Sequence, residues 1–282
     1  MAEQKLVGQN YTVPDLVAKV TGKSKYAEDF RAEGMLFAKL LLSPLPHARV
    51  TRLDLSAALA MPGVKAILTF DDLPKSAATT GARILEGYDA RGTFYISGEL
   101  VGTTSAQWAF VDAADIVAMH AQGHEIGCHT FTHKRACDLD AASLGLEIKQ
   151  NRNYIGSLDP TIEVANFAYP FGYGSFARKR QLRTTFQSCR SIVPGINSGT
   201  VDLQFLRATP LIDSRIDRDA IDRAFEEAQI NNGWLIFYTH DVADEPSPYG
   251  CSPALLTYAL EAASRRKIPV RNMAEALLCA GA

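Results

Sequence analysis

Beyond about residue 64, short apolar runs alternate with longer segments in which apolar residues recur every three or four positions. The short runs predict strands and the longer segments predict helices. The predicted strands are 64–70, 92–96, 125–128, 164–169, 234–238 and 268–270, and the predicted helices are 111–121, 141–157, 217–231, 253–266 and 273–279. Repeated strand–helix units with short connections indicate parallel strands covered by helices, either in a barrel or in an open doubly wound sheet.

The beginning of the chain follows a different pattern. Its predicted elements are hairpin-like strands at 36–42 and 49–55 and a short helix at 56–61. Pro62 and Gly63 then interrupt the chain, and the strand–helix alternation starts directly after them. We therefore expect a small N-terminal segment, 1–62, and one large domain, 63–282.

The composition is that of an ordinary globular protein, with 282 residues, of which 47% are apolar and 21% charged. A formal net charge of -2 provides no basic field to attract nucleic acid. No apolar stretch approaches the ~20 residues that span a bilayer, and the first residues lack the apolar part of a secretory signal. We therefore expect no nucleic-acid partner, no membrane association and a cytoplasmic location.

Five scattered cysteines form no C-x-x-C pair, which argues against both a disulfide framework and a zinc knuckle. They are Cys128, Cys137, Cys189, Cys251 and Cys279. Buried free thiols are the simplest interpretation.

The first candidates for chemistry are two histidines and two aspartates. His129 and His133 are four residues apart, a spacing that places two side chains on one face of a helical turn. Asp71 and Asp72 directly follow the predicted strand 64–70, where adjacent carboxylates are rarely buried unpaired. One carboxylate and both histidines would supply three metal ligands and leave positions open for water and substrate. Taken singly, packing histidines and an Asp-Asp turn that caps a helix remain alternatives.

Two further features also follow predicted strands. In the run from Phe167 to Gly172, Pro170 and Gly172 favour a tight loop that leaves the backbone N–H of Phe171 free to point at a ligand, although an ordinary turn fits as well. His240 emerges from an apolar strand, where it suits a general acid or a satisfied core histidine. The histidines without a partner pattern, interpreted as structural, are His47, His120 and His124.

Four segments, in order and spacing, resemble the motifs of the polysaccharide deacetylase family, the carbohydrate esterases with a NodB-type homology domain. They are Thr69-Phe-Asp-Asp72, Gly127-Cys-His-Thr-Phe-Thr-His133, Phe167-Ala-Tyr-Pro-Phe-Gly172 and Tyr238-Thr-His240. The resemblance runs from about residue 64 to the end of the chain. It implies an α/β fold with a distorted (β/α) barrel, here preceded by a small α/β appendage.

The resemblance also implies a role for each candidate residue. The ligands of one divalent ion, zinc or alternatively cobalt or manganese, would be Asp72, His129 and His133. The loop residues that bind the oxyanion and substrate would be Tyr169, Pro170 and Phe171. Asp71 would be the general base for the metal-bound water, and His240 would protonate the departing amine. Such an ion can lower the pKa of bound water from ~15.7 toward ~7, and one preorganised oxyanion donor lowers the barrier by roughly 3 kcal/mol.

Three positions depart from the family's pattern. Leu73 stands where the family usually has glycine, which is expected to reshape the loop beside the metal. The third motif lacks the arginine that often pairs with the base, so Asp71 is expected to lack that partner. No segment matches the Asp motif that orients the acid histidine, for which Asp213 and Asp241 are weak candidates.

The first ~72 residues resemble a different family. The segments that carry this resemblance are Val20–Phe30, Leu40–Arg49 and Ala58–Thr69. They are similar to the small α/β hammerhead domain that begins the large subunit of xanthine dehydrogenase and aldehyde oxidase relatives. Later segments that hold molybdopterin in that family have no counterpart here, so no molybdopterin is expected.

The leading hypothesis is therefore a metal-dependent hydrolase that removes N-acetyl groups from an N-acetylated amino sugar or polysaccharide. Two alternatives remain at this point: a hydrolase of a small cyclic amide on the same barrel, and a non-catalytic carbohydrate-binding relative. The sequence does not indicate an oligomeric state.

Overall fold

The computed structural model describes residues 16–21 and 65–280, and the elements predicted between residues 36 and 61 lie outside these residues. Leu16–Val20 form a short helix, α1, which the sequence pattern did not predict. The larger described part contains every residue to which a chemical role was assigned. Within the described residues, none of the helices combines the length and apolarity needed to cross a membrane.

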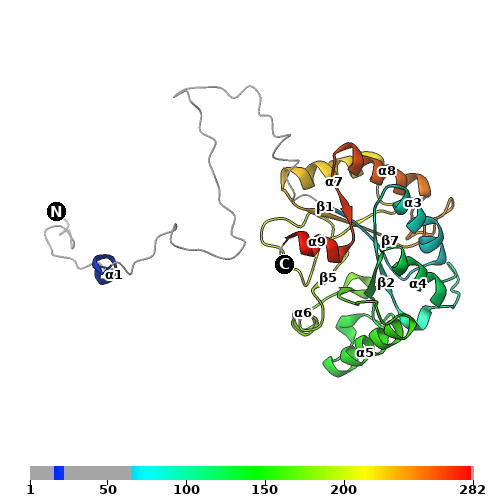
Figure 1. Ribbon diagram of the computed structural model, residues 1–282, viewed down its shortest axis with the longest axis horizontal. Coiled ribbons are helices and arrows are strands. Elements are labelled where there is room, and N and C mark those ends of the chain that lie inside the picture. Colours follow the sequence, from blue (N-terminus) through cyan, green and yellow to red (C-terminus); the bar gives the residue numbers. More distant parts are fainter. Residues whose placement is uncertain (1–15, 22–64, 281–282) are drawn as a thin grey trace, which may run out of the picture. The chain divides into compact units, whose positions relative to one another are not determined.

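Within residues 65–280, eight parallel strands alternate with helices (Figure 1). The strands are β1 (Lys65–Phe70), β2 (Thr93–Ile96), β3 (Glu125–Cys128), β4 (Asn166–Ala168), β5 (Ser188–Arg190), β6 (Thr209–Pro210), β7 (Trp234–Thr239) and β8 (Val270–Arg271). The α-helices are α3 (Ala82–Gly87), α4 (Ala113–Ala121), α5 (Ala141–Leu158), α6 (Phe176–Leu182), α7 (Arg218–Ile230), α8 (Pro253–Arg265) and α9 (Met273–Ala280). Shorter helical turns are η2 (Ala77–Gly81), η3 (Gly98–Leu100), η4 (Ala136–Asp138) and η5 (Pro170–Gly172).

The six predicted strands and five predicted helices are confirmed, with small differences at their ends. Strands β5 and β6 were not predicted because, besides being short, neither is an apolar run: β5 is Ser-Cys-Arg and β6 is Thr-Pro. Helices α3 and α6 were also missed, since each has fewer than two full turns.

The sheet closes through an irregular segment. The strand order is β5-β4-β3-β2-β1-β7-β6, and β8 pairs with the beginning of β1 while β2 pairs with its end. Between the two edge strands, Leu206 forms a parallel bridge with Arg190 of β5, and Thr209–Pro210 then pair with β7. The segment 206–210 thus connects β5 at one edge with β7 near the other. The distorted barrel implied by the family resemblance is confirmed.

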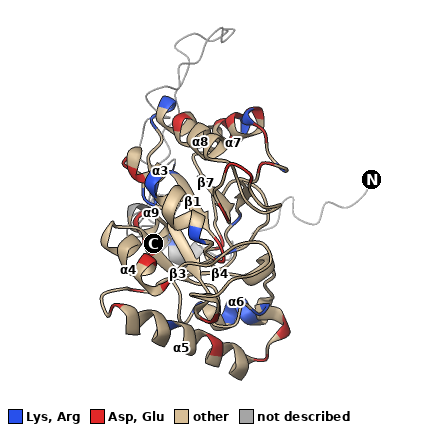
Figure 2. Cartoon of the chain, turned by 90° about the vertical axis from the view of Figure 1, so that its right-hand side faces the viewer, with Lys and Arg blue, Asp and Glu red and all other residues tan. Residues whose placement is uncertain are grey.

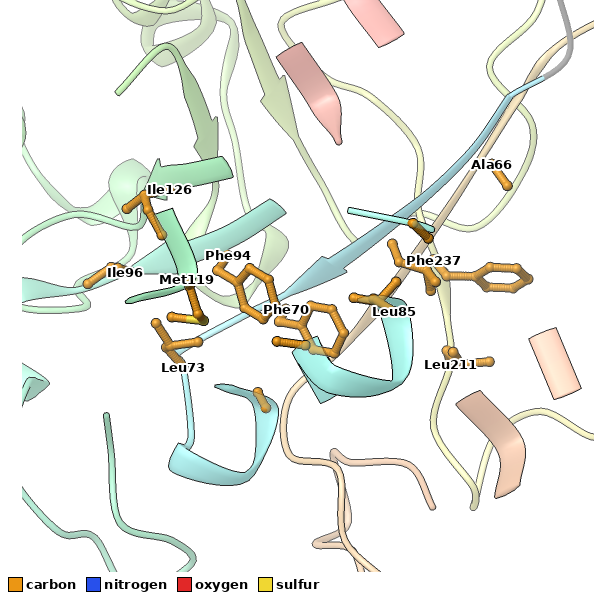
Figure 3. Packing of buried hydrophobic residues seen from close by; sticks show 14 of the residues in the cluster. Ala66, Phe70, Leu73, Leu85, Phe94, Ile96, Met119, Ile126, Leu211 and Phe237 are labelled. Carbon is orange, nitrogen blue, oxygen red and sulfur yellow. The ribbon is translucent and has the colours of Figure 1, made fainter. Parts of the chain in front are cut away.

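Alternation along the strands separates an outer core from the barrel interior. In β1, Leu68 and Phe70 belong to the large apolar cluster, whereas Ile67 belongs to a second cluster and Thr69 donates from its hydroxyl to a backbone carbonyl of β7. The ring of Phe70 stacks on Phe94 of β2 with centroids 4.5 Å apart (Figure 3). Because successive side chains point to opposite faces, the outward residues pack under the helices and the alternate residues point inward.

The end of the barrel at which the strands begin is held by a buried carboxylate. Glu125, at the start of β3, accepts hydrogen bonds from Thr93, Asn166 and the backbone N–H of Ala274 at the start of α9. Burial raises the pKa of Glu125, although these donors oppose the shift. This polar cluster ties the last helix to the barrel, and it lies at the end of the strands opposite to the candidate ligands.

Three cysteines, Cys128, Cys189 and Cys251, are buried free thiols as expected, whereas Cys137 is exposed and Cys279 lies outside the described side chains. Burial raises the pKa of Cys128 to about 11 and that of Cys251 to about 12. Thiols of this kind are inert at neutral pH, so they add packing and no chemistry.

Candidate active site

Four strands deliver charged or titratable side chains to the same end of the barrel. Asp71, His129 and His240 come directly after the last residues of β1, β3 and β7, and Arg190 is the last residue of β5. Each continues the inward-facing set of its strand: Asp71 lies two positions beyond Thr69, and the other three have the same relation to inward neighbours. The strand period therefore places all four inside the carboxyl end of the barrel.

The two histidines do not lie on a helical turn, so that part of the prediction is wrong. Thr130 and His133 have φ angles of 61° and 54°, which a helix does not allow. The loop is held instead by Glu147 of α5, whose carboxylate accepts from the backbone N–H groups of Phe131 and Thr132 at 2.9 and 2.8 Å. The carboxylate also accepts from the hydroxyl of Thr132 at 2.6 Å. A carboxylate of a separate helix thus fixes the loop that presents both histidines.

The side chains of Asp72, His129 and His133 converge. Oδ1 of Asp72 lies 2.8 Å from Nε2 of His133 and 3.4 Å from Nε2 of His129, and the three ligand atoms all lie within 4.8 Å of one another. Burial would raise the pKa of Asp72, but the two histidines outweigh it and hold this pKa well below the usual range. Oδ1 is buried and has no hydrogen bond, because neither ring is aligned to donate to it. A buried, unsatisfied oxygen between two imidazole nitrogens fits a bound cation.

The tautomer of His129 also fits a metal ligand. Its Nδ1 lies 2.8 Å from the carbonyl oxygen of Ala168, which can only accept, so Nδ1 carries the hydrogen. The lone pair is then on Nε2, the atom that faces Asp72. Metal-binding histidines are commonly oriented by such a bond to a backbone carbonyl.

Asp71 has an arginine partner, contrary to the expectation from its motif. Arg190 is fully buried and donates from Nη2 to Oδ1 of Asp71 across a separation of 119 residues. Its guanidinium also donates to the carbonyl of Ser191 and lies over the rings of Tyr95 and Tyr238, 5.2 and 5.4 Å from their centroids. The partner comes from β5, a strand with no sequence signature, and not from the third motif.

Leu73 adopts the left-handed backbone conformation that glycine favours. Its φ is 58°, its N–H donates to the carbonyl of Asp71 at 2.6 Å, and its carbonyl accepts from Val111 at 3.2 Å. A left-handed non-glycine residue costs about 1–2 kcal/mol. The fully buried Leu73 side chain offsets this cost, because burial of a leucine contributes about 1.5–3 kcal/mol. The expected reshaping of the loop is therefore not seen in the backbone of this position.

Left-handed backbone is concentrated at this site. Of eight non-glycine residues with positive φ among the described residues, five lie at the carboxyl end of the barrel, namely Asp72, Leu73, Thr130, His133 and Phe171. Strain of this kind persists where the surrounding structure fixes the chain, and it is common at functional sites.

His240 lies close to one of the candidate metal ligands. Its Nε2 lies 3.9 Å from Oδ2 of Asp72, and its Nδ1 lies 3.1 Å from the carbonyl oxygen of Tyr249. Neither weak candidate for its orienting carboxylate bonds to it. Asp241 accepts from the backbone and hydroxyl of Ser247, and Asp213 accepts from the N–H of Ser252. A backbone carbonyl therefore replaces the expected carboxylate.

The loop after β4 contributes fewer residues than predicted. Phe171, half exposed with φ 60°, lines the cavity, and its ring lies 4.7 Å from that of His133. Tyr169 is buried in the outer core and donates from its hydroxyl to the carbonyl of Gln204, and Pro170 is also buried. Neither of these two is among the residues that line the cavity, because the strand period turns Tyr169 outward with Phe167.

The two aspartates and the three histidines of the site line one cavity of about 590 Å³. Besides Asp71, Asp72 and the three histidines, it is lined by aromatic side chains, namely Trp108, Phe110, Phe171, Tyr173, Tyr238 and Tyr249. A cavity of this size with aromatic walls and a polar floor is typical of a small-molecule site. His120 and His124 lie elsewhere, where they contact Thr161 and Glu86.

A sequence model of the polysaccharide deacetylase family matches residues 60–186. The match covers the motifs with Asp71, Asp72 and both candidate metal-binding histidines, and it ends before Arg190 and His240. The resemblance inferred from the motifs is confirmed for this part of the chain.

Solved structures share the fold at low identity. The chitin deacetylase from the fungal pathogen Colletotrichum lindemuthianum has a TM-score of 0.57 and 17% identity, covering 76% of this chain and 87% of that chain. A family 4 carbohydrate esterase from Streptomyces lividans, in complex with acetate, has a TM-score of 0.52 and 17% identity, covering 73% of this chain and 91% of that chain. Both likenesses support the distorted barrel.

A different relative matches a short stretch. The large molybdopterin subunit of nicotinate dehydrogenase from Eubacterium barkeri is 39% identical over 72 residues, which is 26% of this chain and 17% of that protein. The resemblance to molybdenum hydroxylase large subunits is confirmed over that length. The chain spans less than a fifth of the first curated relatives it matches.

Proposed function

We propose that residues 65–280 form a divalent-metal-dependent hydrolase that removes N-acetyl groups from an N-acetylated amino sugar or polysaccharide. The observation that carries this proposal is the convergence of the ligand atoms of Asp72, His129 and His133 beside a second buried carboxylate, Asp71. The family match and the deacetylase and esterase folds of the neighbours support the same chemistry.

Asp72, His129 and His133 would hold the ion, and two imidazoles with one carboxylate favour zinc, with cobalt or manganese as alternatives. When bound, such an ion polarises the acetyl carbonyl and lowers the pKa of a coordinated water toward ~7. The ring of Phe171 contacts that of His133, and the backbone N–H of Phe171 would stabilise negative charge on the substrate oxygen.

Asp71 is assigned as the general base. Arg190 holds one of its oxygens, fixes the carboxylate plane and compensates its charge in a site where water is largely excluded. The carboxylate lines the cavity, so it can take a proton from the attacking water.

His240 is assigned as the general acid. Its Nδ1 hydrogen is committed to the Tyr249 carbonyl, which leaves Nε2 facing the cavity across from Asp72. A proton on Nε2 would pass to the amine nitrogen as the bond between carbon and nitrogen breaks.

Acetate release from N-acetylglucosamine oligomers tests the proposal, with protein that has been treated with a chelator and then supplied with zinc, cobalt or manganese. We expect release only with added metal, and we expect loss of release in His129→Ala but not in His120→Ala, since His120 lies outside the cavity. Metal-independent release, or release that survives in His129→Ala, would contradict the proposed site. Metal binding without any acetate release would exclude the deacetylase.

A further inference from the structure

Two arginines at the cavity have no acidic partner. Arg135 and Arg215 both line the cavity, and within the described part of the chain neither forms an ion pair with a carboxylate. The two acidic residues of the lining are already committed, since Asp71 is bound by Arg190 and Asp72 lies between the two histidines. With Arg190 counted, three guanidiniums accompany two carboxylates, so the site has one excess positive charge before any metal ion is counted.

Aromatic rings hold the first of these arginines. The guanidinium carbon of Arg135 lies 5.0 Å from the ring centroids of both Phe171 and Tyr173. A guanidinium held by its faces keeps the N–H donors of its edge available, and the planar fork matches a carboxylate with two parallel hydrogen bonds. Phe171 also contacts the ring of His133, so Arg135 lies one side chain away from a proposed metal ligand.

The second arginine lies near another wall of the same cavity. Arg215 and Tyr238 both line the cavity. Burial raises the pKa of the Tyr238 hydroxyl, and the charges of Arg190 and Arg215 oppose this shift. Arg190 is fully buried and bound to Asp71, whereas Arg215 is exposed. Of these two arginines, Arg215 lines the cavity and Arg190 does not, so a ligand can reach Arg215.

The positive charge is local. The chain carries a net charge of -2, and acidic and basic residues are both spread over the surrounding helices (Figure 2). A general attraction for polyanions is therefore not expected, and the excess at the cavity requires a ligand that fits there.

We propose that the substrate carries a carboxylate close to its acetamido group, and that Arg135 and Arg215 bind this carboxylate. This inference rests on the proposed deacetylase and specifies its substrate class as an acidic N-acetylated sugar. Neutral N-acetylated sugars then enter the same cavity but leave both guanidiniums unpaired, and they are deacetylated less efficiently.

The test compares an N-acetylated oligosaccharide that carries a free carboxylate on the acetamido sugar with its neutral methyl ester. We expect the wild type to prefer the free acid at least tenfold in kcat/KM, because hydrogen bonds to a charged group contribute more than those between neutral groups. Arg135→Gln, Arg135→Ala and Arg215→Ala should each lose about tenfold on the free acid and little on the ester. Arg223→Ala, which removes an exposed arginine of α7 outside the cavity lining, is the matched control and should keep the preference.

The ratio of kcat/KM for the acid to kcat/KM for the ester separates recognition from folding. A variant that only disturbs the loop lowers both values equally. Equal rates for acid and ester in the wild type would overturn the inference and leave the proposed function intact. If neither compound releases acetate, titration calorimetry with both compounds decides. Tighter binding of the acid that Arg135→Gln removes would support the inference without the deacetylase, and equal or absent binding would overturn it.

Discussion

Removal of Arg190 tests how the site is built. In Arg190→Met, the buried carboxylate of Asp71 loses its guanidinium partner, while most of the side-chain packing between Tyr95 and Tyr238 is kept. Breaking a buried ion pair by removing one partner costs about 3–5 kcal/mol, because the remaining charge stays uncompensated. The carbonyl of Ser191 also loses a donor, which adds about 1 kcal/mol.

A loss of this size is large compared with the ~5–15 kcal/mol by which a native domain is stable. The double variant Asp71→Asn/Arg190→Met removes both charges, so it should be more stable than Arg190→Met alone. We expect a coupling free energy of about 2–3 kcal/mol between the two positions, since they are in direct contact. Activity should fall by about 10²-fold in Arg190→Met, because the base is no longer held in place.

Urea unfolding at a fixed metal concentration measures the four proteins of this cycle, and acetate release measures their activity. Arg223→Met serves as the control and should change stability by less than ~0.5 kcal/mol, since this arginine is exposed. If Arg190→Met and the double variant were equally stable, the guanidinium would not be compensating Asp71, and the reasoning would be wrong.

Four further predictions follow from the same geometry. His133→Ala should abolish most binding of one divalent ion, measured by calorimetry, and full occupancy would refute the ligand assignment. Asp71→Asn should retain the metal but lose roughly 10²–10⁴ in rate, whereas Asp72→Asn should lose both, and identical behaviour would refute the division of roles. Glu147→Ala should weaken metal affinity about 10–100-fold, because the carboxylate fixes the histidine loop, and an unchanged affinity would show that the loop holds itself. Deletion of residues 1–62 should leave metal binding and activity largely intact, as measured on the truncated protein. Deletion through Asp72 should abolish both, because it removes a central strand and a proposed ligand. If the protein without residues 1–62 were insoluble or inactive, the domain boundary would have to move.

The local pattern was sufficient for most of the strands and helices, whereas the barrel was expected only from the family resemblance. Apolar runs of three to seven residues between amphipathic segments predicted the strands and helices, because burial on a sheet or under a helix requires those periods. Strands β5 and β6 were not predictable, since Ser-Cys-Arg and Thr-Pro are not apolar runs, and their pairing depends on neighbours that are distant in the sequence.

The same division holds for the site. Asp71, Asp72 and the two histidines could be found from sequence because each follows a strong strand or lies close to its partner along the chain. The geometry of these residues could not be found from sequence. In place of the helical turn expected for the histidines, the structure has a strained loop that Glu147 holds.

The ion pair between Arg190 and Asp71 could not be predicted from the sequence. Short-range periodicity determines that parallel strands covered by helices form and that carboxylates and imidazoles lie at the ends of the strands. It left a barrel and an open sheet as alternatives, and only the family resemblance implied the barrel. Only the tertiary structure decides that an arginine 119 residues away becomes the partner of Asp71, and that the carbonyl of Tyr249 orients His240. A hydrogen bond depends on the distance and angle between two groups in the folded protein, and no local sequence pattern determines these for residues far apart in the chain.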